Sequence, residues 1–278
     1  MKNRRSPLAS ALIVFSLVFL CSFALLPVLW GISTSLKTDA GVYSIPPRWI
    51  PDPLTFKNYA DILSNATMLR YFLNTLIIAS LSMFFSLIVA ILGAYGFSRY
   101  RFPGRGTLLW SILFTRVLPR VTVIIPLYIV LRNLKLLNTY AGLILVYMLV
   151  VMPLAVWLLK GFFDNLPYEI EEAAVVDGCS PLGVLVRIII PISLPAIASV
   201  AMYAFILAWN EFLFALIMTN GKAIRPISVG LAFFIDEAGI HWGPLMAASI
   251  MMSIPAVIVF MMLQTQLVRG LSEGAVKG

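Results

Sequence analysis

The chain has 278 residues, of which 61% are hydrophobic and only 12% are charged, and its net charge is +8 at neutral pH. Soluble domains are about 45–50% apolar, so this excess excludes an ordinary soluble fold and predicts a membrane protein. The cations form no basic stripe with interleaved aromatic side chains, so nucleic acid is not an expected partner. The two cysteines, Cys21 and Cys179, predict neither a disulfide nor a metal site.

The first predicted element is a membrane helix over residues 8–32, preceded by three cations within residues 1–7. A signal peptide is the alternative, but its apolar region usually spans about 7–15 residues, whereas about 20 are needed to cross a bilayer. We therefore expect a cytoplasmic segment over 1–7 and an uncleaved helix over 8–32. Prolines and charges return in residues 33–70, which predicts an extracytoplasmic loop with a short surface helix over 55–63.

Three further apolar runs predict the second, third and fourth spans. They cover residues 71–100, about 108–130 and about 140–157, and polar residues and prolines interrupt the middle one. The segment RYRFPGR, residues 99–105, follows the second span and carries three arginines. Arginines in a short loop mark the cytoplasmic side of a membrane.

A predicted loop over residues 164–195 follows the fourth span, and it contains the most polar stretch of the chain, residues 169–195. Pro167 can open a helix, acids occupy its first turns, where they suit the helix dipole, and Gly178 can end it in a left-handed conformation. Ser180 is a suitable N-cap for a second helix, which we expect to stop near Pro191. The four acids are Glu169, Glu171, Glu172 and Asp177. The sequence therefore predicts two short helices outside the bilayer core, with small residues that let a partner protein approach closely.

The remaining spans are predicted over residues 196–218 and 244–268, with a loop between them and a tail over 269–278. Six spans place both termini on one side of the membrane. The positive-inside rule then assigns the termini, the arginine loop and the segment 164–195 to the cytoplasm. The acids of that segment run against the charge bias, and we expect them to meet a cytosolic protein.

Seven positions at fixed spacing carry a family resemblance. Glu172, Ala173, Ala174, Gly178, Ile188, Ile190 and Pro191 match the pattern EAA-x3-G-x9-I-x-[LI]-P, with Ile190 where Leu is usual. The segment resembles the coupling loop of importer permeases in the ATP-binding-cassette superfamily. The stretches NTLIIASLSMFFSLIVAILGAYGFSRYRFPGR, IIPLYIVLRNLKLLNTYAGLIL, AWNEFLFAL and GLSEGAVKG resemble its carbohydrate branch. The likeness extends from Pro27 onward, to the smaller six-helix permease of maltose-type, trehalose and glycerol-phosphate systems.

The resemblance implies an all-α type I importer permease bundle of six transmembrane helices in the cell membrane. It also implies the partners: a second homologous permease, two copies of an ATP-binding subunit, an extracytoplasmic solute-binding protein and a sugar. The implied ATPase contacts are Glu171, Glu172, Ala173, Ala174, Asp177, Gly178, Ile188 and Pro191. The tail, through Gly274 and Lys277, is implied to reach the ATPase interface, the alternative being a disordered terminus.

The chain contains neither a phosphate-binding loop nor, with one histidine, a catalytic triad. We therefore expect no enzyme and no cofactor in this chain, with ATP and magnesium bound by the partner ATPase. Two alternatives remain for the function. In the first, the chain is an importer permease whose solute is a compound other than a sugar, such as glycerol phosphate. In the second, the chain is a carrier driven by an ion gradient. The second alternative favours internal repeats with broken helices, which the sequence does not show.

Polar residues inside the predicted spans are candidates for the substrate path. Arg116 and Arg120 are four residues apart, which predicts one helix face. They either reach the surface or pair with a carboxylate, or they line the path as donors to sugar hydroxyls. Asn210 lies in the fifth span and is expected toward the path, whereas Glu211 either pairs with an arginine or faces the substrate.

Three aromatic residues of the fifth span, Trp209, Phe212 and Phe214, either stack on a sugar ring or pack within the bundle. Asn74, at the start of the second span, is predicted to form hydrogen bonds at a helix end. His241 is predicted to be a surface residue.

Overall fold

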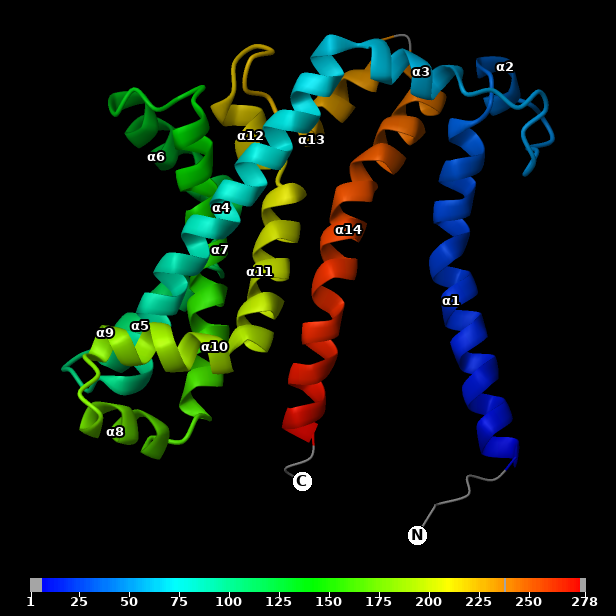
Figure 1. The fold of residues 1–278 in the computed structure, drawn as a ribbon. Helices are drawn as coiled ribbons and strands as arrows, with labels where there is room; N and C mark the ends of the chain where they lie inside the picture. The colour runs from blue at the N-terminus through cyan, green and yellow to red at the C-terminus, as the bar shows by residue number, and fades with distance from the viewer. Residues whose placement is uncertain (1–6, 238, 276–278) are drawn as a thin grey trace. The chain divides into compact units, whose positions relative to one another are not determined.

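The computed structural model describes residues 7–237 and 239–275, and it is mainly helical (Figure 1). The helices of the first half are α1 (Pro7–Ser35), α2 (Asp39–Val42), α3 (Lys57–Ser64), α4 (Ala66–Arg99), α5 (Arg105–Phe114), α6 (Arg120–Asn133) and α7 (Tyr140–Asp164). Those of the polar segment and beyond are α8 (Glu169–Val176), α9 (Pro181–Val184), a π-helical turn (Leu185–Ile189), α10 (Ile190–Ile192), α11 (Leu194–Trp209) and α12 (Leu213–Met218). The last elements are α13 (Ile227–Leu231), a 3-10 turn (Ala232–Phe234), β1 (Ile235–Asp236), β2 (Gly239–Ile240) and α14 (Trp242–Ala275).

Within the described residues, four helices are long and apolar enough to cross a membrane. They cover Ser10–Ser35, Ala66–Arg99, Tyr140–Asp164 and Trp242–Gln264. These helices correspond to the first, second, fourth and sixth predicted spans. Each begins or ends several residues beyond the predicted limits, because the helix continues into the adjoining loop.

The third and fifth predicted spans are each divided between two helices, and do not form one continuous helix. Residues 115–119 separate α5 from α6, and residues 210–212 separate α11 from α12. Pro119 lies at the first break; it lacks a backbone N–H and disfavours a helical conformation in the residue before it. Pro126 and Pro153, by contrast, remain inside α6 and α7.

The chain divides into two compact units, the first comprising 1–69 with 231–253 and the second 70–230 with 254–278. In the first unit, α3 confirms the predicted short helix. Its residue Asn58 is buried and attaches the helix to the end of α1 and the residues after it. The side-chain amide of Asn58 donates to the backbone carbonyls of Ser35 and Lys37 over 2.9 and 3.0 Å. The predicted loop before the sixth span contains α13 and a hairpin in which Ile235 pairs with Ile240.

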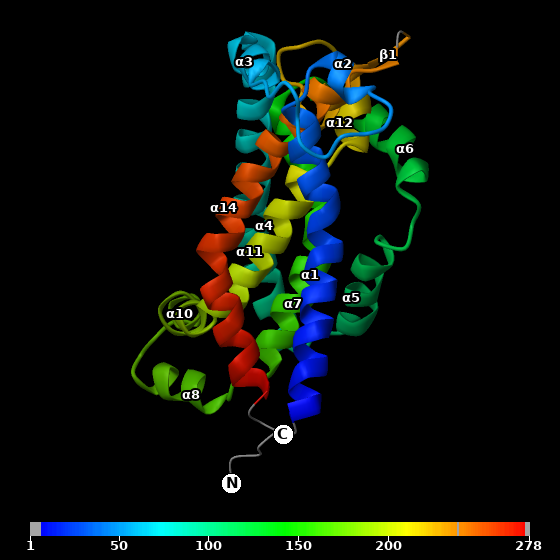
Figure 2. The same cartoon turned by 90° about the vertical axis from the view of Figure 1, so that its right-hand side faces the viewer.

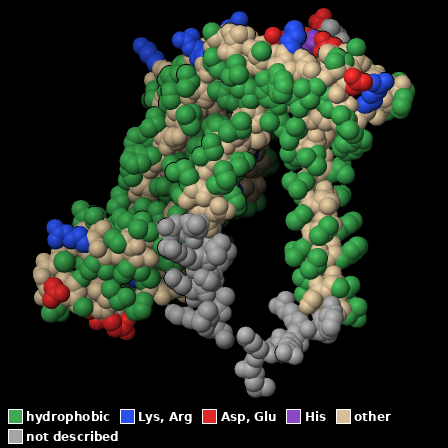
Figure 3. Space-filling model, turned by 45° about the vertical axis from the view of Figure 1, so that its right-hand side comes forward, with side chains coloured by type: hydrophobic (Ala, Val, Ile, Leu, Met, Phe, Trp, Pro, Cys, Tyr) green, Lys and Arg blue, Asp and Glu red, His purple; other side chains and the backbone are tan. Residues whose placement is uncertain are grey.

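The second unit is built around α4, α7 and α11, which run side by side in both ribbon views (Figures 1 and 2). Small residues let these helices approach closely, and Ala90, Ala155 and Ala204 are fully buried between them. On the face seen in Figure 3, charged side chains of this unit gather at the two ends of its helices, and the surface between them is mainly hydrophobic. That distribution is the one expected of helices that cross a bilayer.

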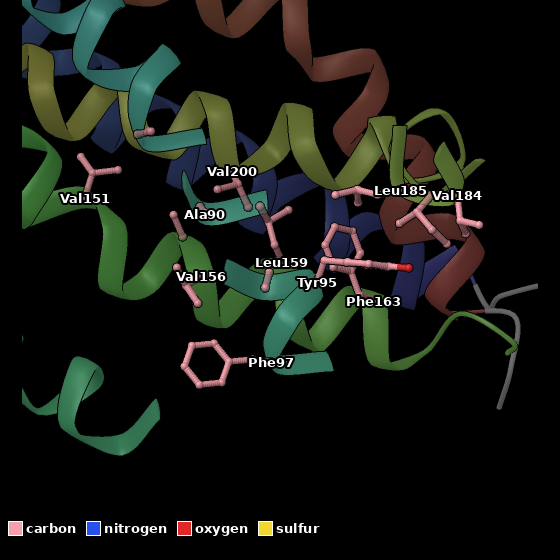
Figure 4. Close-up of a cluster of buried hydrophobic side chains, with 14 of the residues drawn as sticks. Ala90, Tyr95, Phe97, Val151, Val156, Leu159, Phe163, Val184, Leu185 and Val200 are labelled. Atoms are coloured by element: carbon pink, nitrogen blue, oxygen red, sulfur yellow. The ribbon is translucent and has the colours of Figure 1, made fainter. Parts of the chain in front are cut away.

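The core of the second unit continues into the predicted coupling segment. Val184, Leu185 and Ile189, from α9 and the π-helical turn, join the same buried cluster as α4 and α7. Figure 4 shows the rings of Tyr95 and Phe163 beside Leu185, with the two ring centroids 6.5 Å apart. The segment is thus packed against the spans as part of one core.

The helix of the sixth predicted span, α14, is longer than predicted. α14 continues through Ala275, so residues 269–275 of the predicted tail are helical and Gly274 lies in the last turn. Lys277, the other predicted tail contact, lies outside the described residues.

Candidate functional site

The turn after α8 has the conformation that the sequence predicted. Gly178 has a φ of +84°, in the left-handed region. Its N–H donates to the carbonyl of Val175 over 3.0 Å, and the N–H of Cys179 donates to the carbonyl of Ala174 over 2.9 Å. These two bonds form a Schellman motif, which closes the helix and reverses the chain.

The second helix also begins as predicted. The hydroxyl of Ser180 accepts a hydrogen bond from the N–H of Gly183 over 3.2 Å, and Pro181 occupies the first turn. The helix continues through Pro191 and ends at Ile192, one residue later than expected, because the preceding turn is π-helical. A π-helical turn displaces the carbonyl that the proline ring would otherwise meet. After Ser193 the chain enters α11 at an angle of 81°.

The two faces of α8 differ in what they contact. Glu172, Ala173 and Asp177 are exposed, and Val176 is 86% exposed. Ala174 is buried in the core of the second unit. Of the remaining predicted ATPase contacts, Ile188 packs partly against that core and Pro191 is exposed.

Glu171 differs from the expectation of a residue that contacts another protein. It is 9% exposed and faces its own chain. One carboxylate oxygen pairs with Nε of Arg99 at the end of α4, and the other accepts a hydrogen bond from the hydroxyl of Tyr95 over 3.0 Å. A carboxylate at this depth needs such partners, which explains why it turns inward.

Arg99 is a residue of this site that sequence reasoning missed. Its side chain is 5% exposed, whereas the arginine pattern of residues 99–105 indicated only the cytoplasmic side. Arg99 and Tyr95 are four residues apart and therefore share one face of α4. That spacing was the available signal, but nothing local pointed to an acid 72 residues away.

A second polar cluster fixes the end of α7 beside the same site. The hydroxyl of Ser98 donates to Oδ1 of Asp164 over 2.7 Å, and Lys160 pairs with the other oxygen of Asp164. The hydroxyl of Tyr168, just before α8, donates to the carbonyl of Ser98 over 3.3 Å. The ends of α4 and α7 and the start of α8 are therefore held together by polar contacts.

The break in the fifth predicted span is organised by Glu211, which is 3% exposed. Its carboxylate accepts hydrogen bonds from the N–H groups of Phe214 (3.1 Å) and Ala215 (3.2 Å), so it caps the start of α12. Nη1 of Arg120 lies 4.0 Å from the same carboxylate. Asn210 is exposed, and its side-chain amide donates back to the carbonyl of Ile206 over 2.9 Å.

Arg116 and Arg120 do not share a helix face, so that prediction was wrong. Arg116 lies in the break between α5 and α6, whereas Arg120 begins α6. Arg116 donates to the carbonyl of Val150 in α7 over 2.9 Å. Both arginines nevertheless border one cavity of about 490 Å³, whose other walls, from α5, α6, α7 and α12, are mainly apolar.

The aromatic and amide candidates lie as follows. Trp209 is 2% exposed and its ring stacks on Phe205 at 5.3 Å, so in this structure it packs within the bundle. Phe214 is also buried, and Phe212 is partly exposed. Asn74 forms hydrogen bonds as predicted, but from within α4: it binds Tyr140 and two carbonyls in residues 223–225.

His241 is half-exposed, and Nε2 lies 2.9 Å from a carboxylate oxygen of Asp236 in the hairpin. Across the part of the chain that the structure describes, there is no group of three or more His, Cys, Asp or Glu side chains arranged to hold a metal.

Residues 83–273 match the family described as "Binding-protein-dependent transport system inner membrane component". The chain belongs to this family. It is accordingly a multi-pass membrane permease, and the matched range includes α8, Gly178 and both breaks. The likeness inferred from the EAA pattern is thereby confirmed at the level of the family.

Relatives of this permease extend over nearly its whole length. The trehalose/maltose transport system permease protein MalG of Thermococcus litoralis is 35% identical, over 99% of each chain. The sulfoquinovosyl glycerol transport system permease protein SmoH of Agrobacterium fabrum is 32% identical, over 91% of this chain and 89% of the relative. The trehalose transport system permease protein SugB of Mycobacterium tuberculosis is 33% identical, over 92% and 93%.

Among solved structures, the permease is similar to a chain of a bacterial transporter that imports the acidic polysaccharide alginate. The TM-score is 0.81 at 23% identity, and the match covers 96% of this chain and 99% of the other. The two chains share a fold.

Proposed function

We propose that this permease forms half of the translocation pathway of a binding-protein-dependent importer for a sugar or glycoside. The observation that carries the proposal is that α8 is exposed on one face and packed against the spans on the other. One face presents Glu172, Ala173 and Val176 to solvent, and the other is joined to the core of the spans. A short helix exposed on one side and anchored on the other suits a part that receives force from a partner.

The proposed mechanism is alternating access driven by partner ATPase subunits, which bind ATP and magnesium. Two copies of the ATPase contact α8 of this permease and the equivalent helix of a second, homologous permease. When the ATPase dimer closes, α8 moves, and its contacts with the second unit carry the movement to α4, α7 and α11. Hydrolysis by the partner is thereby converted into movement of the spans, without catalysis by this chain.

The proposed topology has six crossings, the third made by α5 with α6 and the fifth by α11 with α12. Both termini and α8 then face the cytoplasm, and the C-terminal end of the chain, including Gly274 and Lys277, approaches the ATPase. The extracytoplasmic solute-binding protein contacts the loop that contains α13 and the β1–β2 hairpin. A solved structure similar to this chain supports this partner: it is an alginate transporter in complex with a periplasmic protein that carries an alginate pentasaccharide.

The substrate class is proposed from the relatives, which carry trehalose, maltose and sulfoquinovosyl glycerol by their names. The arginines that border the cavity, Arg116 and Arg120, are suitable donors to sugar hydroxyls. The same two cations favour a second candidate, an anionic solute such as glycerol phosphate.

Co-purification tests the proposal. The permease is expressed with its companion permease and ATPase, and the ATPase that stays bound is measured. Ala173→Trp places a large side chain on the exposed face of α8, and we expect it to release the ATPase. Leu63→Trp, at an exposed position of α3 in the predicted extracytoplasmic loop, is the matched control and keeps the ATPase. Equal ATPase binding by both variants would contradict the proposed docking face.

A further inference from the structure

α8 has too few residues to hold its own position. It has eight, whereas an isolated helix is marginal below about 12–15 residues. Its place is therefore set by contacts with the rest of the second unit, and its two buried residues are Ala174 and Glu171. Ala174 contributes one methyl group, which packs without a strong directional preference. Glu171 contributes charged hydrogen bonds, which are directional.

The ion pair between Glu171 and Arg99 is buried, and further contacts hold the guanidinium in place. Only 11% and 5% of the two side chains are exposed. Besides Glu171, the guanidinium of Arg99 donates to the carbonyl of Leu166 over 3.3 Å, and it lies 4.4 Å from the ring centroid of Tyr168. Leu166 and Tyr168 belong to the connection between α7 and α8. One planar group at the end of α4 thus contacts α8 and the chain that leads into it.

We propose that the Arg99–Glu171 pair is the positioning contact through which a displacement of α8 is transmitted to α4. This inference rests on the proposed function, because it assumes that a partner ATPase moves α8. It divides the acids of the segment between two tasks. Glu172 faces outward, toward the partner, whereas Glu171 faces inward and fixes α8 to the second span. Without the pair, α8 still binds the partner, but its movement is absorbed at the base of α8.

The test uses the full transporter in vesicles and measures sugar taken up per ATP hydrolysed. Arg99→Met and Glu171→Met each remove one partner, and Arg101→Met, at an exposed neighbouring position, is the matched control. We expect uptake per ATP to fall about tenfold in the first two variants, the effect of losing roughly one charged hydrogen bond. The control keeps the wild-type ratio, and all three keep the ATPase bound. Release of the ATPase by Glu171→Met alone would overturn the inference, because Glu171 would then contact the partner.

A double variant separates positioning from stability. A buried ion pair replaced by two apolar residues of similar size often folds as stably as before. Arg99→Met with Glu171→Met should therefore recover the thermal stability that the single variants lose, while uptake per ATP stays low. Recovery of the ratio along with stability would overturn the inference. If the wild-type complex shows no ATP-driven uptake, the proposed function fails; if it does and every variant keeps its ratio, only this inference fails.

Discussion

Glu211 has two separable contacts, and replacing each one predicts a different loss of stability. Its carboxylate caps α12 through the N–H groups of Phe214 and Ala215, at 3.1 and 3.2 Å. The same carboxylate lies 4.0 Å from Nη1 of Arg120, whose side chain is 49% exposed. Sequence reasoning left open whether Glu211 pairs with an arginine or faces the substrate. The structure confirms the pairing, with Arg120, and adds a second role, which is to cap the helix that follows the break in the fifth span.

The contacts set the expected magnitudes. Glu211→Ala leaves two buried N–H groups without an acceptor, at about 1–3 kcal/mol each, so the free energy of unfolding should fall by about 2–6 kcal/mol. One oxygen of Glu211 accepts from both N–H groups, so Glu211→Gln can keep both bonds through its single oxygen and should lose less than Glu211→Ala. Arg120→Ala removes a long contact to a half-exposed cation, which is worth less than about 1 kcal/mol after solvent screening.

Denaturant unfolding of the purified permease in mixed micelles measures the three variants side by side. The expected order of destabilisation is Glu211→Ala, then Glu211→Gln, then Arg120→Ala. A loss for Arg120→Ala as large as that for Glu211→Ala would refute the reasoning, because the ion pair would then dominate over the cap.

Three further predictions follow from local geometry. Gly178→Ala forces a residue with a side chain into the left-handed region, which costs about 1–2 kcal/mol of conformational free energy, and should lower ATP-driven uptake. Gly178→Asn should lower uptake less, because asparagine tolerates that region. Gly142→Ala places a Cβ 2.1 Å from a backbone carbonyl oxygen and should abolish the yield of folded protein, whereas Gly161→Ala, in open space on the same helix, should not. Asn74→Leu removes the side chain that binds the carbonyls of Ala223 and Arg225, so trypsin should cut after Lys222 faster than in the wild type.

Local sequence rules predicted the turn and the helix start within residues 164–195, because that geometry is decided within a few residues. Gly178 accepts a left-handed conformation, Ser180 caps the following helix, and each signal lies next to the feature it specifies. The apolar runs of four spans were equally clear, since about 20 apolar residues have few alternatives to a membrane helix.

The errors have a common physical origin, which is that contacts distant in sequence override local preference. Pro119 coincides with a break, yet Pro126 stays inside a helix, so a proline by itself does not decide where a span divides. Glu211 carries no helix-breaking signal, and its capping role depends on the break it sits in. The inward direction of Glu171 depends on Arg99, which another span supplies.

The central claim is that α8 faces the cytosol, and cysteine labelling tests it most directly. In a chain with Cys21→Ser and Cys179→Ser, single cysteines replace Val176, 86% exposed on α8, and Ile45, 95% exposed in the predicted outer loop. With a membrane-impermeant thiol reagent, Ile45→Cys should react in spheroplasts. Val176→Cys should react only in inside-out vesicles, and the bound ATPase should protect it. Equal reaction of Val176→Cys and Ile45→Cys from the outside would contradict the account.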